Sequence, residues 1–243
     1  MPNSLVAESF RSIRTHLLFS SPDVQLRTLI ITAARAEEGK TFTTLNLGTA
    51  IAQAGKSVLL VEADMRRPSF SKLFSLGTPG KTFGLSSLVM KRCRPEEVII
   101  KMPKNDHMAV LPCGPKPPNP SELLSSKSMD AVIAELRERF DIVLMDCPPV
   151  LGLADARVLS TKVDGCLVVI RHHKTSLKDV TKTKESIQAI GGRIVGAILN
   201  RVKPEPFGYY YGGYPYYSYH HDEAKEGKKK GVKKRFWRKK TKS

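Results

Sequence analysis

Residues 26–41 read LRTLIITAARAEEGKT, and this segment carries the strongest structural signal of the chain. Its beginning, 26–32, is an apolar and β-branched run, which is typical of a buried strand. A polar loop over 33–39 follows and ends in Gly39, and a helix is expected over 40–54. Because backbone N–H groups at a helix N-terminus attract anions, this strand–loop–helix unit predicts a phosphate-binding site.

Residues 34–41 fit the permissive form of the Walker A motif, with Ala in place of the first Gly. We expect Lys40 to reach the β- and γ-phosphate oxygens of ATP, and the Thr41 hydroxyl to ligate Mg²⁺. An ordinary strand–loop–helix that contains Gly-Lys-Thr is the alternative. The residues of this segment that we expect to bind the nucleotide are Glu38, Gly39, Lys40, Thr41 and Phe42.

Two further motifs count against that alternative, because each places acids at the end of a buried strand. Residues 141–149 read DIVLMDCPP, so that Asp146 lies where ligands bind in open α/β sheets, and we expect it to hold Mg²⁺ directly or through water. Residues 58–68 read VLLVEADMRRP and end a strand in Glu62 and Asp64. A salt-bridged loop is one interpretation, but acids beside a phosphate loop usually serve metal binding or proton transfer. The candidate catalytic residues are Lys40, Glu62, Asp64 and Asp146, and the candidate metal ligands are Thr41, Asp64 and Asp146.

Short apolar strands alternate with helical patterns along the rest of the body. This order predicts an α/β fold of the P-loop NTPase type, with a mostly parallel sheet flanked by helices and a disordered C-terminal tail. The expected further strands cover 57–61, 108–111, 142–145, 165–170 and 194–199, and the expected further helices cover 4–19, 129–139, 154–161 and 177–190. In the first helix, Leu5, Phe10, Ile13 and Leu17 fall near one face. The predicted domains are 1–202 for the P-loop domain, 203–221 for a tyrosine-rich tail and 222–243 for a polybasic tail.

Length and composition are consistent with one large domain and a short tail. The chain has 243 residues, of which 41% are hydrophobic, and no run of about 18 apolar residues suggests a membrane-spanning helix. The N-terminus lacks the apolar stretch of a signal peptide, so a cytoplasmic location is expected. The cysteines, at 93, 113, 147 and 166, lack metal-ligand spacing and are expected to be reduced.

The tail concentrates two residue types. All seven tyrosines lie within 11 positions, at Tyr209, Tyr210, Tyr211, Tyr214, Tyr216, Tyr217 and Tyr219. From Lys225 onward, 11 Lys and Arg face one acid, Glu226, within a total net charge of +17. The tyrosines indicate either a phosphorylation cluster on a flexible tether or an aromatic sticker. The polycation indicates either nucleic acid or an anionic membrane surface as a partner.

Together these segments resemble the bacterial tyrosine autokinases of exopolysaccharide and capsule synthesis, which fall among the partition and cell-division ATPases with deviant P-loops. The most specific similarity is 58–68, which is similar to the family's extra Walker motif, a hydrophobic strand followed by D-x-D-M-R-x-P. Residues 83–86 and 114–123 are similar to further family segments, and the resemblance covers nearly the whole chain. Asn200 matches the position that reads the adenine, and the adjacent Arg201 is included in the expected nucleotide site.

The resemblance implies in-line transfer of the γ-phosphoryl group to a tyrosine, with either Glu62 or Asp64 taking the proton. It also implies that the tail cluster is phosphorylated by a neighbouring subunit of a ring-like homo-oligomer, an octamer in the family. Glu8, Arg11 and Arg14 resemble the family's subunit-contact motif. The expected partners are a membrane-spanning activator of the polysaccharide co-polymerase type and a cognate tyrosine phosphatase, at the inner face of the cell membrane.

Three departures from the family pattern keep other functions open. Glu62 stands where the family usually has Asp, and 36–38 carry Glu37 and Glu38 where Pro and Gly are common, so these acids should repel a polyphosphate unless they point outward. Arg35 occupies the place of the signature lysine of partition ATPases. A partition-type ATPase switch without kinase activity is therefore the first alternative. A nucleic-acid-binding tail on a degenerate domain is the second.

Overall fold

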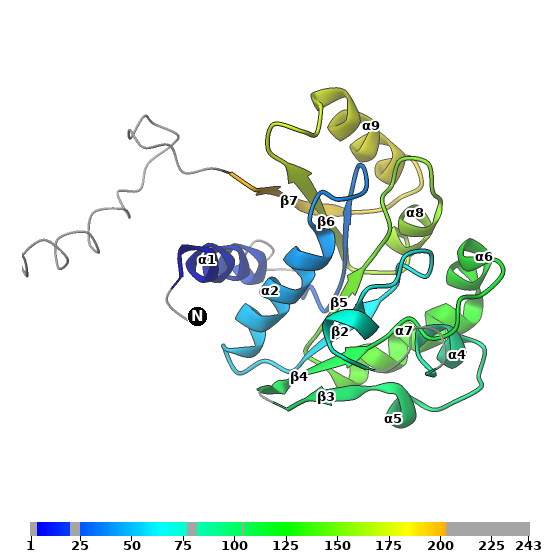
Figure 1. Ribbon diagram of the computed structural model, residues 1–243. Helices are drawn as coiled ribbons and strands as arrows, with labels where there is room; N and C mark the ends of the chain where they lie inside the picture. Colours follow the sequence, from blue (N-terminus) through cyan, green and yellow to red (C-terminus); the bar gives the residue numbers. More distant parts are fainter. Residues whose placement is uncertain (1–3, 20–24, 77–81, 104, 203–243) are drawn as a thin grey trace, which may run out of the picture. The chain divides into compact units, whose positions relative to one another are not determined.

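A seven-stranded sheet flanked by helices makes up the part of the chain that the structure describes, residues 4–19, 25–76, 82–103 and 105–202 of a computed structural model (Figure 1). The strand order is β3-β4-β2-β5-β1-β6-β7, and all neighbouring pairs are parallel except the antiparallel β3–β4 pair. The strands are β1 Thr28–Ala33, β2 Val58–Glu62, β3 Ile100–Met102, β4 Asn105–Leu111, β5 Ile142–Asp146, β6 Gly165–Arg171 and β7 Ile194–Asn200. This arrangement confirms the predicted fold class.

Helices cover both faces of the sheet. They are α1 Leu5–Phe19, α2 Lys40–Ala52, α3 Phe70–Leu73, α4 Leu85–Val89, α5 Pro95–Val98, α6 Pro120–Ser125, α7 Lys127–Arg139, α8 Asp155–Ser160 and α9 Leu177–Gln188. The core on one face receives α1, α2 and Phe70 of α3, and the core on the other face receives α4 to α9. Both faces are therefore apolar, as a parallel sheet requires.

The central strand β1 is buried along its whole length. Ile30 packs into the core below α4 to α9, whereas Leu29 and Ile31 pack into the core below α1 and α2. Since successive side chains point to opposite faces, a strand with helices on both sides has no solvent-facing position.

The expected strands and the five expected helices are present, with ends that differ by a few residues. In the first helix Phe10 and Leu17 are buried and Ile13 packs against the same core, whereas Leu5, in the first turn, is 63% exposed. The sequence patterns missed β3 and the short helices α3 to α6, since elements of three to six residues are too short to show a period.

No helix among the described residues is both long and apolar enough to cross a lipid bilayer. The predicted tyrosine-rich and polybasic segments, 203–221 and 222–243, lie outside the described residues.

Candidate active site

The phosphate loop joins the end of β1 to the start of α2. Gly39 immediately precedes α2 and has φ +101°, a conformation that side chains with a Cβ rarely adopt. A Cβ at this position would also lie 2.0 Å from Nδ2 of Asn200. That amide donates to the backbone carbonyl of Glu38 at 2.9 Å. The end of β7 therefore fixes the loop directly before the helix N-terminus.

The two unexpected acids of the loop have different environments. Glu38 is 2% exposed, and its carboxylate accepts hydrogen bonds from the Thr175 hydroxyl at 2.6 Å and from the backbone N–H of Arg35 at 3.3 Å. Glu37 is exposed, has φ +63° and lines the cavity described below. The side chain of Glu38 is thus engaged with the segment after β6, whereas Glu37 remains at the cavity.

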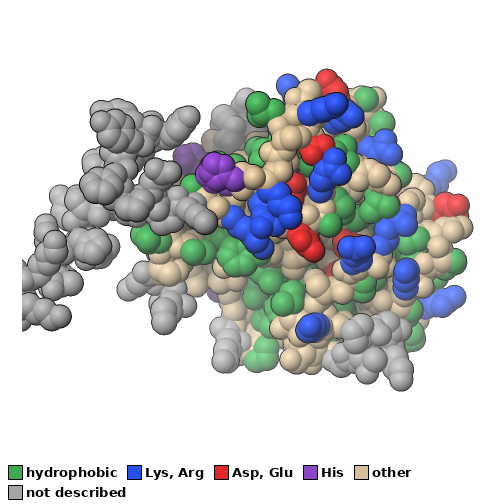
Figure 2. All heavy atoms as spheres, turned by 45° about the horizontal axis from the view of Figure 1, so that its top comes forward, with side chains coloured by type: hydrophobic (Ala, Val, Ile, Leu, Met, Phe, Trp, Pro, Cys, Tyr) green, Lys and Arg blue, Asp and Glu red, His purple; other side chains and the backbone are tan. Residues whose placement is uncertain are grey.

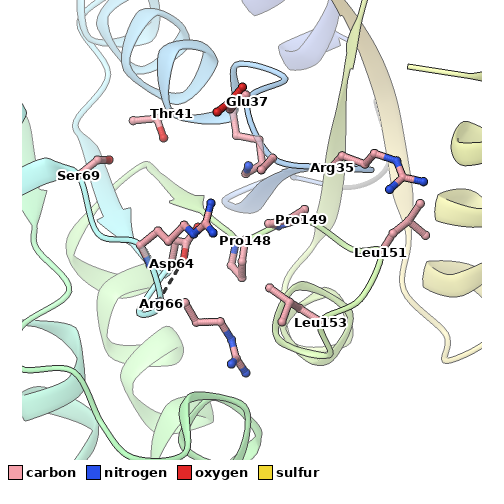
Figure 3. A pocket seen from close by; sticks show the side chains of 13 residues that line it. Arg35, Glu37, Thr41, Asp64, Arg66, Ser69, Pro148, Pro149, Leu151 and Leu153 are labelled. Carbon is pink, nitrogen blue, oxygen red and sulfur yellow. Dashed lines mark hydrogen bonds between the residues drawn. The ribbon is translucent and has the colours of Figure 1, made fainter. Parts of the chain in front are cut away.

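Arg35 is held within its own chain. Its guanidinium makes two hydrogen bonds to Asp179 in the first turn of α9, Nε to Oδ2 at 2.9 Å and Nη2 to Oδ1 at 3.0 Å. The hydrogen bonds and the charge of Asp179 raise the pKa of Arg35. In Figure 3 the Arg35 side chain points away from Asp64.

Lys40, Thr41 and Asp146 meet at the carboxyl end of the sheet. Lys40 is 9% exposed and lines the cavity together with Thr41. The Thr41 hydroxyl donates to Oδ2 of Asp146 at 2.5 Å. The other oxygen of Asp146, Oδ1, is buried and has no hydrogen-bond partner among the described residues. Burial raises the pKa of Asp146 to about 7, although Thr41 and Lys40 act in the opposite direction.

The two acids at the end of β2, Glu62 and Asp64, have different surroundings. Asp64 lines the cavity, and its Oδ1 accepts the backbone N–H groups of Arg66 at 3.2 Å and Arg67 at 3.0 Å. Glu62 is 1% exposed and does not line the cavity. Its carboxylate instead accepts three backbone N–H groups, those of Ser69, Phe70 at 2.6 Å and Cys113 at 3.1 Å. Burial nevertheless raises its pKa.

A cavity of about 560 Å³ connects these groups. Figure 3 shows Thr41 and Asp64 on one side of the cavity, with Pro148 and Pro149 opposite, and Leu153 farther along it. Figure 2 views the side to which the carboxyl ends of the strands point, where basic side chains surround several acids. The lining residues are Arg35, Ala36, Glu37, Lys40, Thr41, Asp64, Arg66, Arg67, Ser69, Pro148, Pro149, Leu151 and Leu153.

The remaining predicted nucleotide residues lie beside the loop. The Asn200 side chain contacts the loop, whereas Arg201 is exposed with φ +58°. The Phe42 side chain is 48% exposed and packs edge-to-face on Phe10 of α1, with ring centroids 5.9 Å apart. None of these three side chains lines the cavity.

The predicted contact motif on α1 is engaged within the subunit. Arg11 and Glu8 form an ion pair at 2.5 Å. Arg14 is half-buried and donates to the carbonyl of Ala50 in α2 at 3.0 Å. The motif therefore also attaches α1 to the body of its own subunit, and its contact with another subunit stays a prediction.

Comparison with known proteins places this geometry in a family. The family described as an AAA domain matches residues 27–198. The tyrosine-protein kinase YwqD of Bacillus subtilis (strain 168) is 40% identical over 212 residues, which cover 86% of this chain and 88% of YwqD. The putative tyrosine-protein kinase CapB of Staphylococcus aureus is 34% identical, over 87% of this chain and 92% of CapB. The chain belongs to the bacterial tyrosine-protein kinases.

A solved structure of this family has the same fold. The kinase domain of the Escherichia coli tyrosine kinase ETK superposes with a TM-score of 0.78 at 33% identity, and the match covers 87% of this chain and 82% of that domain. The extra acidic motif after β2, the Walker A loop and Asp146 thus belong to a bacterial tyrosine kinase domain with a nucleotide-binding P-loop.

Several residues around the site were not identified from the sequence. Thr175 and Asp179 hold the outer side of the phosphate loop, and Asp155 and Ser121 bind Arg66 beside the cavity. Ser121 lies in the segment 114–123, which the family resemblance singled out without a role. The other three follow strands or begin helices, positions that are too common to indicate a function.

Proposed function

We propose that this kinase transfers the γ-phosphoryl group of ATP to tyrosines of its own C-terminal cluster, on a neighbouring subunit. The observation that supports this most directly is the hydrogen bond from Thr41 to the buried Asp146 beside Lys40, with Asp64 lining the same cavity. In this arrangement a lysine, a hydroxyl and two carboxylates meet at a helix N-terminus, which is the set of groups that phosphoryl transfer requires.

The residues fit Mg²⁺ as well as ATP. Hydroxyl and carboxylate oxygens are the protein ligands that Mg²⁺ prefers. Oδ1 of Asp146 is buried without a hydrogen-bond partner among the described residues, and burial raises the pKa of this carboxyl, so a cation beside it would stabilise the charged form. Thr41, Asp146 and Asp64 would hold the ion directly or through water. The bound ion would neutralise charge on the phosphates.

The chain's own groups perform the remaining tasks. Lys40 and the backbone N–H groups at the start of α2 bind the phosphates. Asp64 accepts the proton of the incoming phenol, because it lines the cavity and Glu62 does not. The apolar wall of Pro148, Pro149 and Leu153 excludes water and supports the ring of the tyrosine.

The biological setting is proposed from the family. The subunits form a ring-like homo-oligomer, an octamer, through Glu8, Arg11 and Arg14. A membrane-spanning activator of the polysaccharide co-polymerase type binds the kinase, and a cognate phosphatase reverses the modification. The polybasic tail binds the anionic inner face of the cell membrane. Phosphorylation thereby regulates polymerisation and export of an exopolysaccharide or capsule.

The partition-type switch is the competing function. It needs a cation at the position of Arg35 that reaches into a partner's site. The two hydrogen bonds from Arg35 to Asp179 of the same chain count against that role and favour the kinase.

Incubation of the purified protein with γ-labelled ATP tests the proposal. The wild type should acquire label that withstands denaturation and alkali, and Lys40→Met should acquire none. Lys56→Met serves as the matched control, because Lys56 is exposed between α2 and β2 and does not line the cavity. Release of free phosphate without labelled protein would support the switch. Strong DNA binding that survives Lys40→Met would support the nucleic-acid-binding tail.

A further inference from the structure

An ion pair between Arg66, which lines the cavity, and a buried aspartate has no part in the proposed chemistry. The carboxylate of Asp155 is fully buried and accepts two hydrogen bonds from Arg66, Nε to Oδ2 at 2.6 Å and Nη2 to Oδ1 at 3.1 Å. The Ser121 hydroxyl also donates to Oδ1 of Asp155 and accepts from Nη2 of Arg66 at 3.1 Å. Three side chains from three separate segments thus form one closed cluster.

The pair is ionised at neutral pH. Burial raises the pKa of Asp155, but the hydrogen bonds from Arg66 and Ser121 outweigh it, so the pKa lies below its ordinary value. The hydrogen bond to Asp155 raises the pKa of Arg66. A bidentate guanidinium–carboxylate pair restricts both distance and orientation, which a lysine could not do to the same degree.

One member of the pair, Asp155, follows a segment that is hydrogen-bonded to the start of the phosphate loop. Asp155 begins α8 and follows the segment 147–154, which leaves β5 directly after Asp146. Within this segment the backbone N–H groups of Val150 and Leu151 donate to the carbonyls of Ala33 and Ala34 at 2.9 and 3.2 Å. Asp155 is therefore connected to the start of the phosphate loop through short backbone hydrogen bonds.

The other member, Arg66, belongs to the loop that carries Asp64. Oδ1 of Asp64 accepts the backbone N–H groups of Arg66 and Arg67, so the backbone of these two residues sets the direction of the carboxylate. In Figure 3 the Arg66 side chain extends from this loop on the side away from Thr41. The guanidinium therefore anchors the backbone that orients Asp64.

We propose that the Arg66–Asp155 pair is a positioning element, which holds the Asp64 carboxylate in register with Thr41 and Asp146. This inference rests on the proposed function, because Asp64 matters only if it binds the metal or takes the proton. Asp155 does not line the cavity and acts through Arg66, and Ser121 completes the contact. The segment 114–123 thereby acquires a function, which is to support this pair.

Asp155→Asn tests the proposal, because it keeps the shape of the side chain and removes its charge. The control is Asp164→Asn. Asp164 also pairs with an arginine, Arg137 at 2.9 Å, and accepts backbone N–H groups. It directly precedes β6, however, and therefore lies at the amino ends of the strands, whereas the cavity lies at their carboxyl ends. Each variant is characterised by its melting temperature, by its rate of self-labelling per folded molecule, and by the Mg²⁺ concentration needed for half-maximal binding of a fluorescent ADP analogue.

We expect Asp155→Asn to label about 10- to 100-fold more slowly, since displacement of a reacting group by about 1 Å can reduce a rate 10²-fold. It should also need several-fold more Mg²⁺ for nucleotide binding. Asp164→Asn should lose thermal stability without either change. Equal labelling rates and equal Mg²⁺ requirements for Asp155→Asn and the wild type would overturn the proposal.

The double variant Arg66→Met/Asp155→Leu separates positioning from folding, because Asp155 is fully buried and apolar replacement of both partners leaves no buried charge unpaired. A stable double variant that labels slowly supports positioning, and one with wild-type labelling rejects it. If the double variant labels slowly but Asp155→Asn labels at the wild-type rate, Arg66 contacts the substrate itself and the positioning role is wrong. If the wild type acquires no label, the proposed function fails, and the Mg²⁺ requirement for nucleotide binding still decides whether the pair acts on Asp64.

Discussion

Asp146→Asn should change the pH dependence of folding in the absence of metal. The wild-type carboxylate is 2% exposed, and its Oδ1 has no hydrogen-bond partner among the described residues. Its charge is therefore poorly compensated when no cation is bound. Asparagine has nearly the same shape and carries no charge, so the difference between the two proteins isolates the effect of that charge.

The expected size follows from the pKa. Burial raises the pKa of Asp146 from 3.8 to about 7, a difference of about three units, and each unit corresponds to about 1.36 kcal/mol. Between about pH 4 and pH 7 the folded state binds more protons at this site than the unfolded state, so stability falls as the pH rises. The wild type should thus lose about 4 kcal/mol relative to Asp146→Asn across this range.

Urea unfolding in EDTA at a series of pH values measures this difference directly. The free energy of unfolding of the wild type, relative to Asp146→Asn, should decrease from about pH 4 to pH 7 and stay constant above. Added Mg²⁺ and nucleotide should reduce the difference above pH 7, because a bound cation stabilises the ionised carboxylate. Parallel pH profiles for the two proteins in EDTA would refute the reasoning. They would mean that Asp146 keeps an ordinary pKa in the folded state.

Three further predictions concern neighbouring groups. Glu62→Gln should lower the free energy of unfolding by about 1–3 kcal/mol, because the amide nitrogen of glutamine cannot accept a hydrogen bond and leaves at least one of the three backbone N–H groups without its acceptor. The labelling rate of Glu62→Gln per folded molecule should stay within a few-fold of the wild type. Asp64→Asn, by contrast, should label at least about 100-fold more slowly than the wild type. If Glu62→Gln were the slower of the two variants, Glu62 would be the base. Gly39→Ala should weaken binding of fluorescent ADP at least about 10-fold, because the position has a positive φ and the added Cβ would clash with Asn200. An unchanged affinity in a titration would contradict the loop geometry. Arg14→Ala should lower the sedimentation coefficient, because Arg14 belongs to the proposed subunit contact. It should also lower the melting temperature, because Arg14 bonds to α2. A normal melting temperature would show that the bond to α2 contributes little.

Local patterns were sufficient to predict most of the fold. Buried parallel strands consist mostly of apolar and β-branched residues, and the helices between them show their own period. The strands β1, β2 and β5 and the helices around them could therefore be predicted from the sequence. The antiparallel edge strand β3 could not, because it has three residues, of which two are exposed. The strand β3 forms by pairing with its neighbour β4, and the three residues of β3 carry no sign of that pairing.

The site was predictable where it follows from topology. The carboxyl ends of parallel strands meet at one edge of the sheet, and so Lys40, Thr41, Asp64 and Asp146 come together as expected. Glu62 differs because its partners decide its role. One of them, Cys113, lies 51 positions along the chain, and no spacing in the sequence could show that the carboxylate points toward backbone N–H groups.

The phosphate loop shows how an unfavourable sequence is accommodated. Two acids in a loop that binds a polyphosphate should weaken binding by repulsion. Glu38 is buried, however, and its charge is opposed by the Thr175 hydroxyl and by a backbone N–H group. The outer side of the loop is also fixed by the Arg35–Asp179 pair. These contacts direct one acid away from the phosphates and leave only Glu37 at the cavity, where solvent screens its charge.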